Sequence, residues 1–458
     1  MKKYLLILCL AISQFAAAQP YEPRWESVDS RPVPAWFAEA RFGIFIHWGL
    51  YSVPAWATVD KAIATHPVYS EWYWWQKNTD TSRVGDATRA YHKATYGDDF
   101  KYPDFVRDFK AERFDPAAWA DLFAASGAKY VVLTSKHHEG FALWPSAEAW
   151  NWNSVDVGPH RDLAGELSEA VREKGLRMGF YYSLYEWYNP IYLNDVDRYV
   201  EQHMLPQMKD LVCRYSPDIL WTDGEWEHPS STWRSEEFLA WLYNESPVRE
   251  TVVVNDRWGK ETRGRHGGFY TTEYDLDSSH AANMSAAAHP WEECRGIGNS
   301  FGYNRVETLE HYSSTQQLIV TLIERVARGG NLLLDVGPKA DGTIPLVMQE
   351  RLLGIGAWMG VNGEAIYGTE PWDKAAQNKA DGVFFTTKGD DLYVLYTKPQ
   401  AVLTLKGVAT PRRADILGAE ARVRCAASKG GVRLTLPAEV LRDAQERPQV
   451  VRLAGALR

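Results

Sequence analysis

The first candidate for chemistry is Asp223, which follows the short apolar run ILW at residues 219–221 and stands just before Gly224. Short apolar runs that end at turn residues are typical of buried strands. Parallel α/β folds place reactive carboxylates at the C-terminal ends of such strands. Trp221 and Trp226 add flat apolar surface that suits the C–H faces of a sugar ring. An aspartate at this position can also simply cap the next segment. The residues at the other strand ends are needed to distinguish a catalytic from a capping role.

Polar side chains follow four further apolar runs. They are His47, the pair His137 and His138, Tyr181 and Arg257. In a barrel all of them would converge on one face. Each has a simpler explanation, since a histidine can have a structural partner, a tyrosine can belong to the core and an arginine can pair with a neighbouring carboxylate. Several independent runs that end in hydrogen-bonding groups are nevertheless hard to obtain from packing alone, so the pattern predicts a binding site.

The adjacent histidines, His137 and His138, raise the question of a metal ion. Neighbouring residues on a strand point to opposite faces, so both could hold one ion only if the strand has already ended. The helical His-x-x-x-His spacing of zinc sites is absent from the sequence. Neutral imidazoles that exchange hydrogen bonds with sugar hydroxyls explain the pair better, and no metal ion or other cofactor is expected.

The elements that must position these residues alternate between strand and helix patterns. We expect strands over residues 41–47, 129–134, 176–183, 219–222, 251–254 and 331–336, and helices over residues 115–127, 163–174, 195–213, 235–243 and 315–327. This alternation favours an α/β fold with a parallel (β/α)8-like, TIM-type barrel. The barrel is expected over residues 19–368, a length that insertions explain.

After Gly368 the pattern changes to short strands separated by Gly, Asp and Pro. They are expected at residues 383–387, 392–396, 402–405 and 432–436, with no helix between them. Short strands at this spacing predict a small antiparallel β-sandwich over residues 369–458.

Composition limits the possible partners. The 458 residues carry a net charge of −9 and no basic run, so nucleic acid is not an expected partner. The 20 Trp and 24 Tyr residues exceed what packing alone usually needs, and sugar-binding clefts are one place for such an excess. The cysteines Cys213, Cys294 and Cys425 are widely spaced and fit neither a disulfide framework nor a zinc site.

The N-terminus has the pattern of a secretory signal peptide over residues 1–18. Two lysines precede an apolar stretch, and small residues stand before a cleavage point expected between Ala18 and Gln19. The stretch is too short to span a membrane, so membrane insertion is not expected. We expect an exported protein that is periplasmic or extracellular.

Six sequence runs, in this order, resemble the α-L-fucosidases of glycoside hydrolase family 29. They are RFGIFIHWG (41–49), SEWY (70–73), KHHEGF (136–141), WTDGEW (221–226), VNDRWG (254–259) and GGNLLLDVGP (329–338), and the match spans about residues 30–370. The resemblance implies a retaining exo-glycosidase that removes terminal α-L-fucose from fucosylated glycans, with Asp223 as the nucleophile. It implies substrate-binding roles for His47, Glu71, Trp72, His137, His138, Tyr181, Trp221, Arg257 and Phe301.

The acid/base of such a reaction is harder to assign from sequence. Glu273, in the run TTEY, resembles the acid/base of one branch of the family, and Glu292, in the run PWEEC, is the alternative, with Asp275 as a third candidate. The carboxyl group that protonates the leaving oxygen needs a raised pKa. We therefore expect Glu273, or else Glu292, to be buried or to lie beside the charge of Asp223.

Two other functions remain open at this point. A retaining glycosidase of the same fold could act on another sugar, such as galactose, but its 6-hydroxyl would need a polar partner where Phe301 is expected. A carbohydrate-binding protein without hydrolytic activity would be expected to lack the nucleophile, whereas Asp223 is present.

Overall fold

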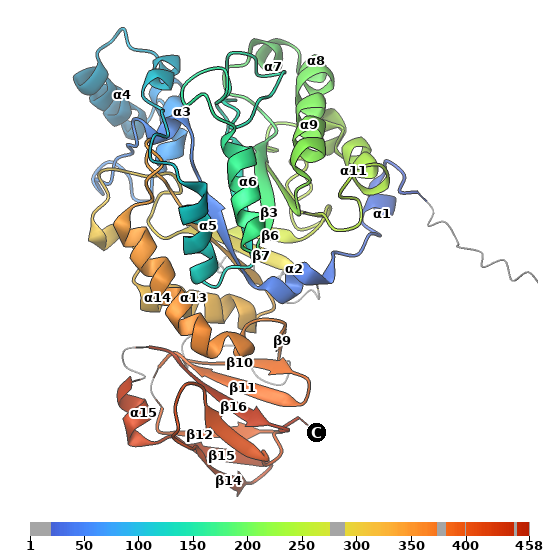
Figure 1. Cartoon of the computed structure of the whole chain (residues 1–458), viewed down its shortest axis with the longest axis vertical. Coiled ribbons are helices and arrows are strands. Elements are labelled where there is room, and N and C mark those ends of the chain that lie inside the picture. The colour runs from blue at the N-terminus through green and yellow to red at the C-terminus, as the bar shows by residue number, and fades with distance from the viewer. Residues whose placement is uncertain (1–19, 275–288, 373–381, 399, 444–446, 458) are drawn as a thin grey trace, which may run out of the picture.

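A computed structural model describes residues 20–274, 289–372, 382–398, 400–443 and 447–457 (Figure 1). The predicted signal peptide, the acid/base candidate Asp275 and part of the region that follows the predicted domain boundary lie outside these residues. Among the helices that the structure describes, none is long and apolar enough to cross a lipid bilayer.

A curled sheet of eight parallel strands forms the core of the larger domain, in the order β5-β4-β3-β2-β1-β8-β7-β6. The strands are β1 Phe42–Ile46, β2 Tyr130–Lys136, β3 Arg177–Ser183, β4 Ile219–Asp223, β5 Val253–Val254, β6 Tyr270–Glu273, β7 Trp291–Gly296 and β8 Asn331–Val336. Two backbone hydrogen bonds join its edges, from Gly268 to Asn255 (3.1 Å) and from Phe269 to Val254 (2.9 Å). The sheet therefore closes into the predicted barrel, irregularly between β5 and β6.

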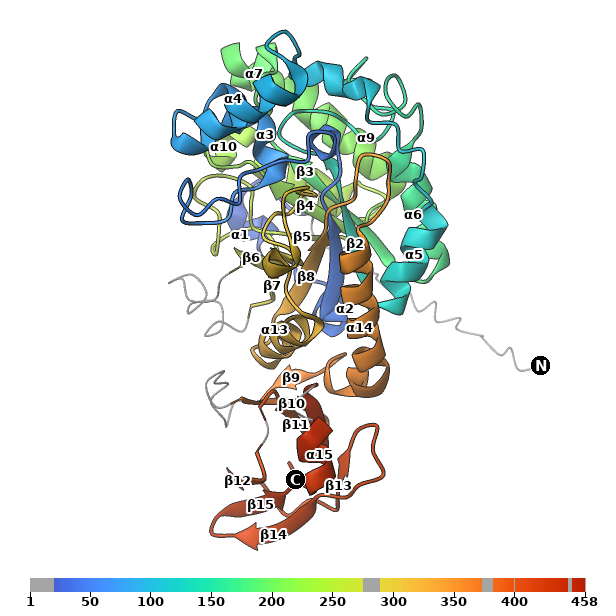
Figure 2. The same ribbon diagram turned by 90° about the vertical axis from the view of Figure 1, so that its left-hand side faces the viewer.

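Helices surround this sheet and cover the loops at its C-terminal end (Figures 1 and 2). They are α1 Trp25–Val28, α2 Ala35–Ala40, α3 Tyr73–Asn78, α4 Arg83–Tyr96, α5 Pro116–Ala125, α6 Leu163–Glu173, α7 Pro190–Asn194, α8 Val196–Tyr199, α9 Leu205–Tyr215, α10 Ser230–Trp233, α11 Ser235–Asn244, α13 Thr315–Ala327 and α14 Leu346–Asn362, with a π-helical turn at Val200–Met204. Local signals explain their starts. The Asp115 carboxylate caps α5 by accepting from the Ala118 amide, and Pro116 occupies the first turn.

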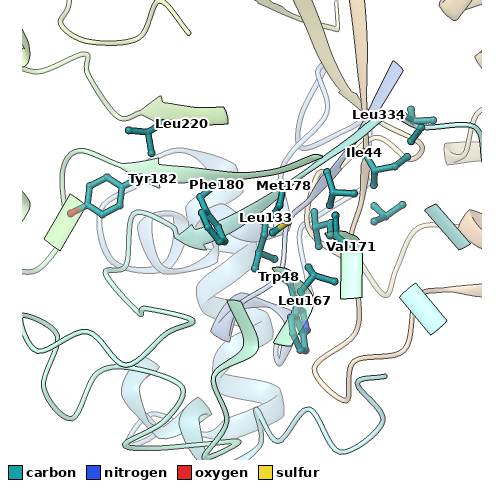
Figure 3. Packing of buried hydrophobic residues seen from close by; sticks show 14 of the residues in the cluster. Ile44, Trp48, Leu133, Leu167, Val171, Met178, Phe180, Tyr182, Leu220 and Leu334 are labelled. Atoms are coloured by element: carbon teal, nitrogen blue, oxygen red, sulfur yellow. The ribbon is translucent and has the colours of Figure 1, made fainter. Parts of the chain in front are cut away.

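Alternate residues of each strand face opposite sides of the barrel wall. Ile44, Leu133, Phe180 and Leu220 belong to one buried cluster on the outer side of the wall, which also includes Leu167 and Val171 of α6 (Figure 3). The residues between them face the barrel interior, where they form a separate cluster that includes Phe45, Val132, Tyr181, Ile219, Trp221 and Leu333. This period-2 alternation sets which of two neighbouring side chains can reach a site inside the barrel.

The N-terminal end of the barrel is closed by α2. Phe37 of α2 stacks on Phe269 with ring centroids 4.2 Å apart, and it also contacts Tyr130. Asn331 Nδ2 donates to the Phe37 carbonyl at 2.7 Å. Because this end is filled, only the C-terminal ends of the strands are left to form a pocket.

The C-terminal region is the predicted antiparallel β-sandwich. One sheet has the order β13-β16-β11-β10-β9 and the other β12-β15-β14. The strands are β9 Glu370–Pro371, β10 Val383–Lys388, β11 Asp391–Tyr396, β12 Val402–Lys406, β13 Arg413–Ile416, β14 Arg424–Ser428, β15 Gly431–Thr435 and β16 Gln449–Ala454. Among the described residues no helix lies between the four expected strands, and the short helix α15 (Ala438–Asp443) follows the last of them, before the unpredicted β16. The six residues of α15 leave too short a period to read from the sequence.

The sandwich packs against α13 and α14, at the end of the barrel opposite α3, α4 and α7 (Figures 1 and 2). Trp358 Nε1 of α14 donates to the Pro448 carbonyl at 2.8 Å, and Thr386 Oγ1 of β10 donates to the Ala365 carbonyl at 2.8 Å. The sandwich thus supports the base of the barrel and lies away from the C-terminal strand ends.

Candidate active site

A pocket of about 490 Å³, including its open mouth, lies at the C-terminal ends of the barrel strands. Eleven of the residues proposed from the sequence line it: His47, Glu71, Trp72, His137, His138, Tyr181, Trp221, Asp223, Arg257, Glu273 and Phe301. Phe45, Tyr69, Trp226 and Cys294 complete the lining. The predicted convergence of strand ends on one face is therefore present.

Asp223, the last residue of β4, lies at the centre of a hydrogen-bond network. Tyr181 Oη donates to its Oδ2 at 2.8 Å, and Arg257 Nη1 donates to its Oδ1 at 2.8 Å. His138 Nε2 lies 3.7 Å from Oδ2. Only 8% of Asp223 is exposed, so its carboxylate has little freedom to rotate. This arrangement fixes one carboxylate in a sugar-sized pocket.

Arg257 links this carboxylate to a second one. Its Nη2 lies 2.6 Å from Glu273 Oε1, in an ion pair that is not aligned as a hydrogen bond. Its Nε donates to Thr271 Oγ1 at 3.0 Å, and the guanidinium lies 4.3 Å above the Trp221 ring. Although burial opposes the charge, Glu273 and Asp223 raise the pKa of Arg257, so the cation persists. The nitrogens that contact Asp223 and Glu273 belong to the same guanidinium group, so the two carboxylates lie close together.

His47 and Glu71 form a second polar wall. His47 Nδ1 lies 2.6 Å from Asp335 Oδ1 of β8. Burial lowers the pKa of His47 well below its usual value, and His137 adds to this effect. Burial also raises the pKa of Asp335, with a further contribution from Glu71. Both directions favour a neutral imidazole beside a neutral carboxyl group. Glu71 Oε2 accepts from the Gly302 amide at 2.9 Å.

Both histidines of the 137–138 pair face the pocket, because β2 ends at Lys136. His138 Nδ1 is 2.7 Å from Ser183 Oγ, which fixes the ring. Burial lowers the pKa of His138 well below the usual value, and His137 and His47 reinforce this, so it remains neutral. Within the described residues, no group of three or more His, Cys, Asp or Glu side chains gathers as a metal site would require. The histidines are instead arranged to exchange hydrogen bonds with hydroxyls.

Aromatic rings enclose the rest of the pocket. Phe301 is 5% exposed and packs 4.9 Å from the His47 ring and 5.5 Å from Tyr69, between centroids. Trp72 and Trp226 lie 6.0 Å apart, and Trp226 is 39% exposed. The pocket therefore has an apolar patch at Phe301 and aromatic side chains that reach its mouth.

Glu292, the alternative acid/base, lies elsewhere. It is the second residue of β7, 1% exposed, and accepts hydrogen bonds from Tyr130 Oη and from Trp221 Nε1, the latter at 3.2 Å. It does not contribute to the lining of the pocket. Burial raises its pKa to about 7, although the two donors oppose this effect. Glu292 thus has a raised pKa, as a general acid needs, but it lies inside the barrel. Trp221, which lines the pocket, donates to it.

Some lining residues carried no sequence signal as site residues. Phe45 belongs to an apolar run that is typical of the core, Tyr69 stands directly before the run SEWY, and Cys294 lies in a strand that the sequence does not predict. Asp335, which does not line the pocket but contacts His47, has no signal in the sequence beyond its place in the run GGNLLLDVGP. Trp226 was noted as an aromatic flank of Asp223, and that proximity was the one available signal.

Comparison with known proteins agrees with this geometry. The family model described as Alpha-L-fucosidase matches residues 8–364. Tissue alpha-L-fucosidase of Rattus norvegicus is 45% identical over 447 residues, covering 94% of this chain and 92% of the relative. The enzyme named Tissue alpha-L-fucosidase of Homo sapiens is 45% identical, covering 86% and 82%.

Solved structures extend the likeness to the fold. The crystal structure of Thermotoga maritima alpha-fucosidase in complex with a mechanism based inhibitor is 38% identical, with a TM-score of 0.78 over 96% of this chain and 100% of that one. Its match includes both the barrel and most of the sandwich. With this coverage and identity, the chain belongs to the α-L-fucosidase family, glycoside hydrolase family 29.

Proposed function

We propose that this protein is a retaining exo-α-L-fucosidase that hydrolyses terminal α-L-fucosyl linkages of glycans. The observation that carries the proposal is the pair of carboxylates, Asp223 and Glu273, that Arg257 contacts at 2.8 Å and 2.6 Å in one pocket. Retaining glycosidases need two carboxyl groups about 5–5.5 Å apart. A shared guanidinium keeps two carboxylates close enough to act on one glycosidic bond.

We assign the nucleophile role to Asp223. Tyr181 and Arg257 each donate to one oxygen of its carboxylate, which fixes the orientation of the group. In the first step an Asp223 oxygen attacks C1 of the fucosyl unit, and the bond from C1 to the leaving oxygen breaks. The product is a glycosyl-ester on Asp223 with inverted configuration at C1.

We assign the acid/base role to Glu273, which ends β6 and is 36% exposed at its side chain. Its carboxyl group gives a proton to the leaving oxygen in the first step. In the second step its carboxylate takes a proton from water, whose oxygen attacks C1 and releases Asp223. Two inversions return the original configuration. Partial exposure at the pocket mouth suits a group that must meet both leaving group and water.

The remaining polar groups would bind the sugar hydroxyls. Nδ1 of His47 and of His138 is engaged by Asp335 and Ser183, so each ring offers its Nε2 to a hydroxyl, and Glu71 can accept. Phe301 offers an apolar surface that suits the C5 methyl group of fucose. A 6-hydroxyl, as in L-galactose, would lose hydrogen bonds to water against this ring.

The finer aspects of location and substrate rest on the sequence. The signal-peptide pattern of residues 1–18 supports export to the periplasm or the medium. The proposed partners are fucosylated glycans, and the net charge of −9 argues against nucleic acid as a partner.

The proposal is tested first with a panel of chromogenic glycosides and the purified protein. We expect release of L-fucose from aryl α-L-fucosides, with full activity in EDTA. Asp223→Gly should lose at least about 10³-fold in activity, and azide should restore part of it with inverted configuration at C1. Equal or faster release of galactose, or a variant at Asp223 with a tenth of wild-type activity, would contradict the proposal.

Glu273→Ala and Glu292→Ala form a matched pair for the acid/base. Glu273→Ala should strongly lower the rate of hydrolysis of substrates with poor leaving groups, because these leaving groups need a proton as the bond breaks. For substrates with very acidic leaving groups, the rate of the first step should change little. Azide should then speed the breakdown of the glycosyl-enzyme, and the product should have retained configuration at C1. If Glu292→Ala shows this pattern and Glu273→Ala does not, the two roles exchange.

A further inference from the structure

A second pocket of about 800 Å³, including its mouth, lies beside the loop that carries His137 and His138. Its lining comes from the loops after β2 and β3 and from α7, at the end of the barrel opposite the sandwich (Figure 1). The lining residues include Glu139, Glu148, Trp150, Trp152, Glu186 and Tyr188. His138 lines the active site, and the next residue, Glu139, lines the second pocket. The two pockets are therefore on either side of the same loop.

Trp150 is the most unusual residue of this pocket. Its side chain is 77% exposed, more than any other large hydrophobic residue among those the structure describes. Trp152 and Tyr188, with ring centroids 6.0 Å apart, add two half-buried rings to the lining. An exposed indole held over a pocket presents a flat apolar face to a ligand, and the C–H face of a pyranose ring is a natural match for it.

Polar side chains also line this pocket. Glu139 is 3% exposed, and its Oε2 has no hydrogen-bond partner within the described part of the chain, with His137 Nδ1 at 3.6 Å. Tyr188 Oη is also buried and, within the same residues, unpartnered. Glu186 Oε2 accepts from Asn189 Nδ2 at 2.7 Å, and Asn189 Oδ1 in turn accepts from the Ile191 amide at 2.9 Å, so this side chain is fixed at the pocket wall.

The charge of the pocket limits which class of sugar it can bind. Three carboxylates line it, and none of the described residues that line it is a lysine or arginine. Glu186 Oε1 is paired with the buried Lys136 Nζ at 2.7 Å and with His203 Nε2 at 2.9 Å, whereas within the described ranges Glu139 and Glu148 have no such pairing with a lysine or arginine. Carboxylates accept hydrogen bonds from hydroxyls but repel anions. A neutral, hydroxyl-rich sugar therefore fits the site better than a sialylated or sulfated one.

Aromatic side chains connect the two pockets. Trp72 of the active site packs on Trp187 at 5.3 Å, Trp187 on Trp74 at 5.6 Å, and Trp74 on Tyr188 at 5.0 Å, all between ring centroids. Trp72, Trp74 and Tyr188 are each partly exposed. A glycan that leaves the active site would find aromatic surface along this route.

We propose that the pocket at Trp150 is a second carbohydrate-binding site, which takes a neutral pyranose ring of a glycan. The inference rests on the proposed function only for the choice of glycan. The ring comes either from the distal part of the chain whose fucose is in the active site or from a separate glycan, and both present the same chemistry.

The test uses the full-length protein with the active site saturated by L-fucose. A fucose-free tetrasaccharide of alternating galactose and N-acetylglucosamine is titrated by calorimetry into the wild type, Trp150→Ala, Trp150→Tyr and Leu346→Ala. Leu346 is 69% exposed and lines none of the pockets described above, so it controls for the loss of an exposed apolar side chain. We expect a Kd at least tenfold weaker in Trp150→Ala, and little change in Trp150→Tyr, which keeps a ring, or in Leu346→Ala.

A kinetic arm separates the two sources of the sugar. If one glycan spans both pockets, Trp150→Ala should lower kcat/KM at least fivefold for a fucosylated pentasaccharide and spare an aryl α-L-fucoside. If the site holds a separate glycan, the loss should appear only on a multivalent fucosylated glycoprotein. Turnover of the aryl α-L-fucoside by the wild type tests the proposed function independently.

Three results would overturn the second site. They are no binding of the tetrasaccharide to the wild type at 20-fold molar excess over a millimolar protein sample, equal Kd values for the wild type and Trp150→Ala, or a wild-type dimer that Trp150→Ala converts to a monomer. The last would show that a second copy of the chain covers Trp150.

Discussion

Replacing Glu292 with glutamine is expected to stabilise the protein at alkaline pH relative to acidic pH. The carboxyl group is fully inside the barrel, and burial raises its pKa from 4.5 to about 7. Below pH 4.5 the folded and unfolded states are both protonated, so the group makes no difference between them. As the pH rises toward 7, the unfolded state ionises while the folded state keeps its proton, and the stability of the wild type falls.

The size of this effect follows from the raised pKa of Glu292. Each pH unit over which only the unfolded state has ionised corresponds to about 1.4 kcal/mol. Between pH 5 and pH 8 the wild type should therefore lose about 2–3 kcal/mol of unfolding free energy through this one group. Glu292→Gln has the shape of the protonated acid but does not titrate, so it should not lose this amount.

The assay is urea unfolding followed by near-ultraviolet circular dichroism at pH 5 and pH 8. The quantity of interest is the change with pH of the difference between Glu292→Gln and the wild type, which cancels the other titrating groups. Glu293→Gln is the matched control, because Glu293 faces outward and pairs with Arg325 Nε at 2.6 Å. If the difference for Glu292→Gln is the same at both pH values, the group titrates normally and the account of its burial is refuted.

Three further outcomes are expected from the active site. Asp335→Ala should lower kcat/KM by about 10- to 100-fold, because the buried His47 loses its partner, whereas Asp335→Asn should stay within about threefold since the amide oxygen still accepts; equal losses would argue against an orienting role. Tyr181→Phe should lower kcat/KM about tenfold by removing a donor to Asp223, and a KM effect alone would point to sugar binding. Phe301→Ser should reduce the preference for aryl α-L-fucosides over α-L-galactosides by about 10-fold or more, and an unchanged ratio of the two kcat/KM values would remove Phe301 from specificity.

Alternation along strands explains why the sequence was informative about most of the pocket. Tyr181 and Tyr182 are neighbours, and one must face inward if the other faces outward. Tyr181 lines the pocket, whereas Tyr182 lies on the outer face and donates to Gln207 Oε1 at 2.7 Å. Long apolar runs such as that of β3 show their ends in the sequence, so the side chains that follow them can be ranked as site residues.

The acid/base could not be settled this way, because neither β6 nor β7 has an apolar run that marks its ends. The register pairs Glu273 with Cys294 and Thr271 with Glu292. Glu292 is therefore two positions, about 7 Å, further from the C-terminal ends of the strands than Glu273. Because of this offset, Glu273 lines the pocket, whereas Glu292 lies deeper inside the barrel. Two glutamates that look alike in sequence thus differ only through strand boundaries that tertiary contacts define.

The junction between β5 and β6 shows why an arginine joins the two carboxylates. β5 has only two residues, and the backbone hydrogen bonds across this junction stand before β6 begins. Side chains supply the rest: Asp256 Oδ1 accepts from Thr271 Oγ1 at 2.7 Å, and Arg257 Nε donates to the same hydroxyl at 3.0 Å. The remaining nitrogens of Arg257 then face the two carboxylates. Because five donors lie in one rigid plane, a single side chain can close the barrel and hold both reacting groups, which a flexible lysine in its place could not do.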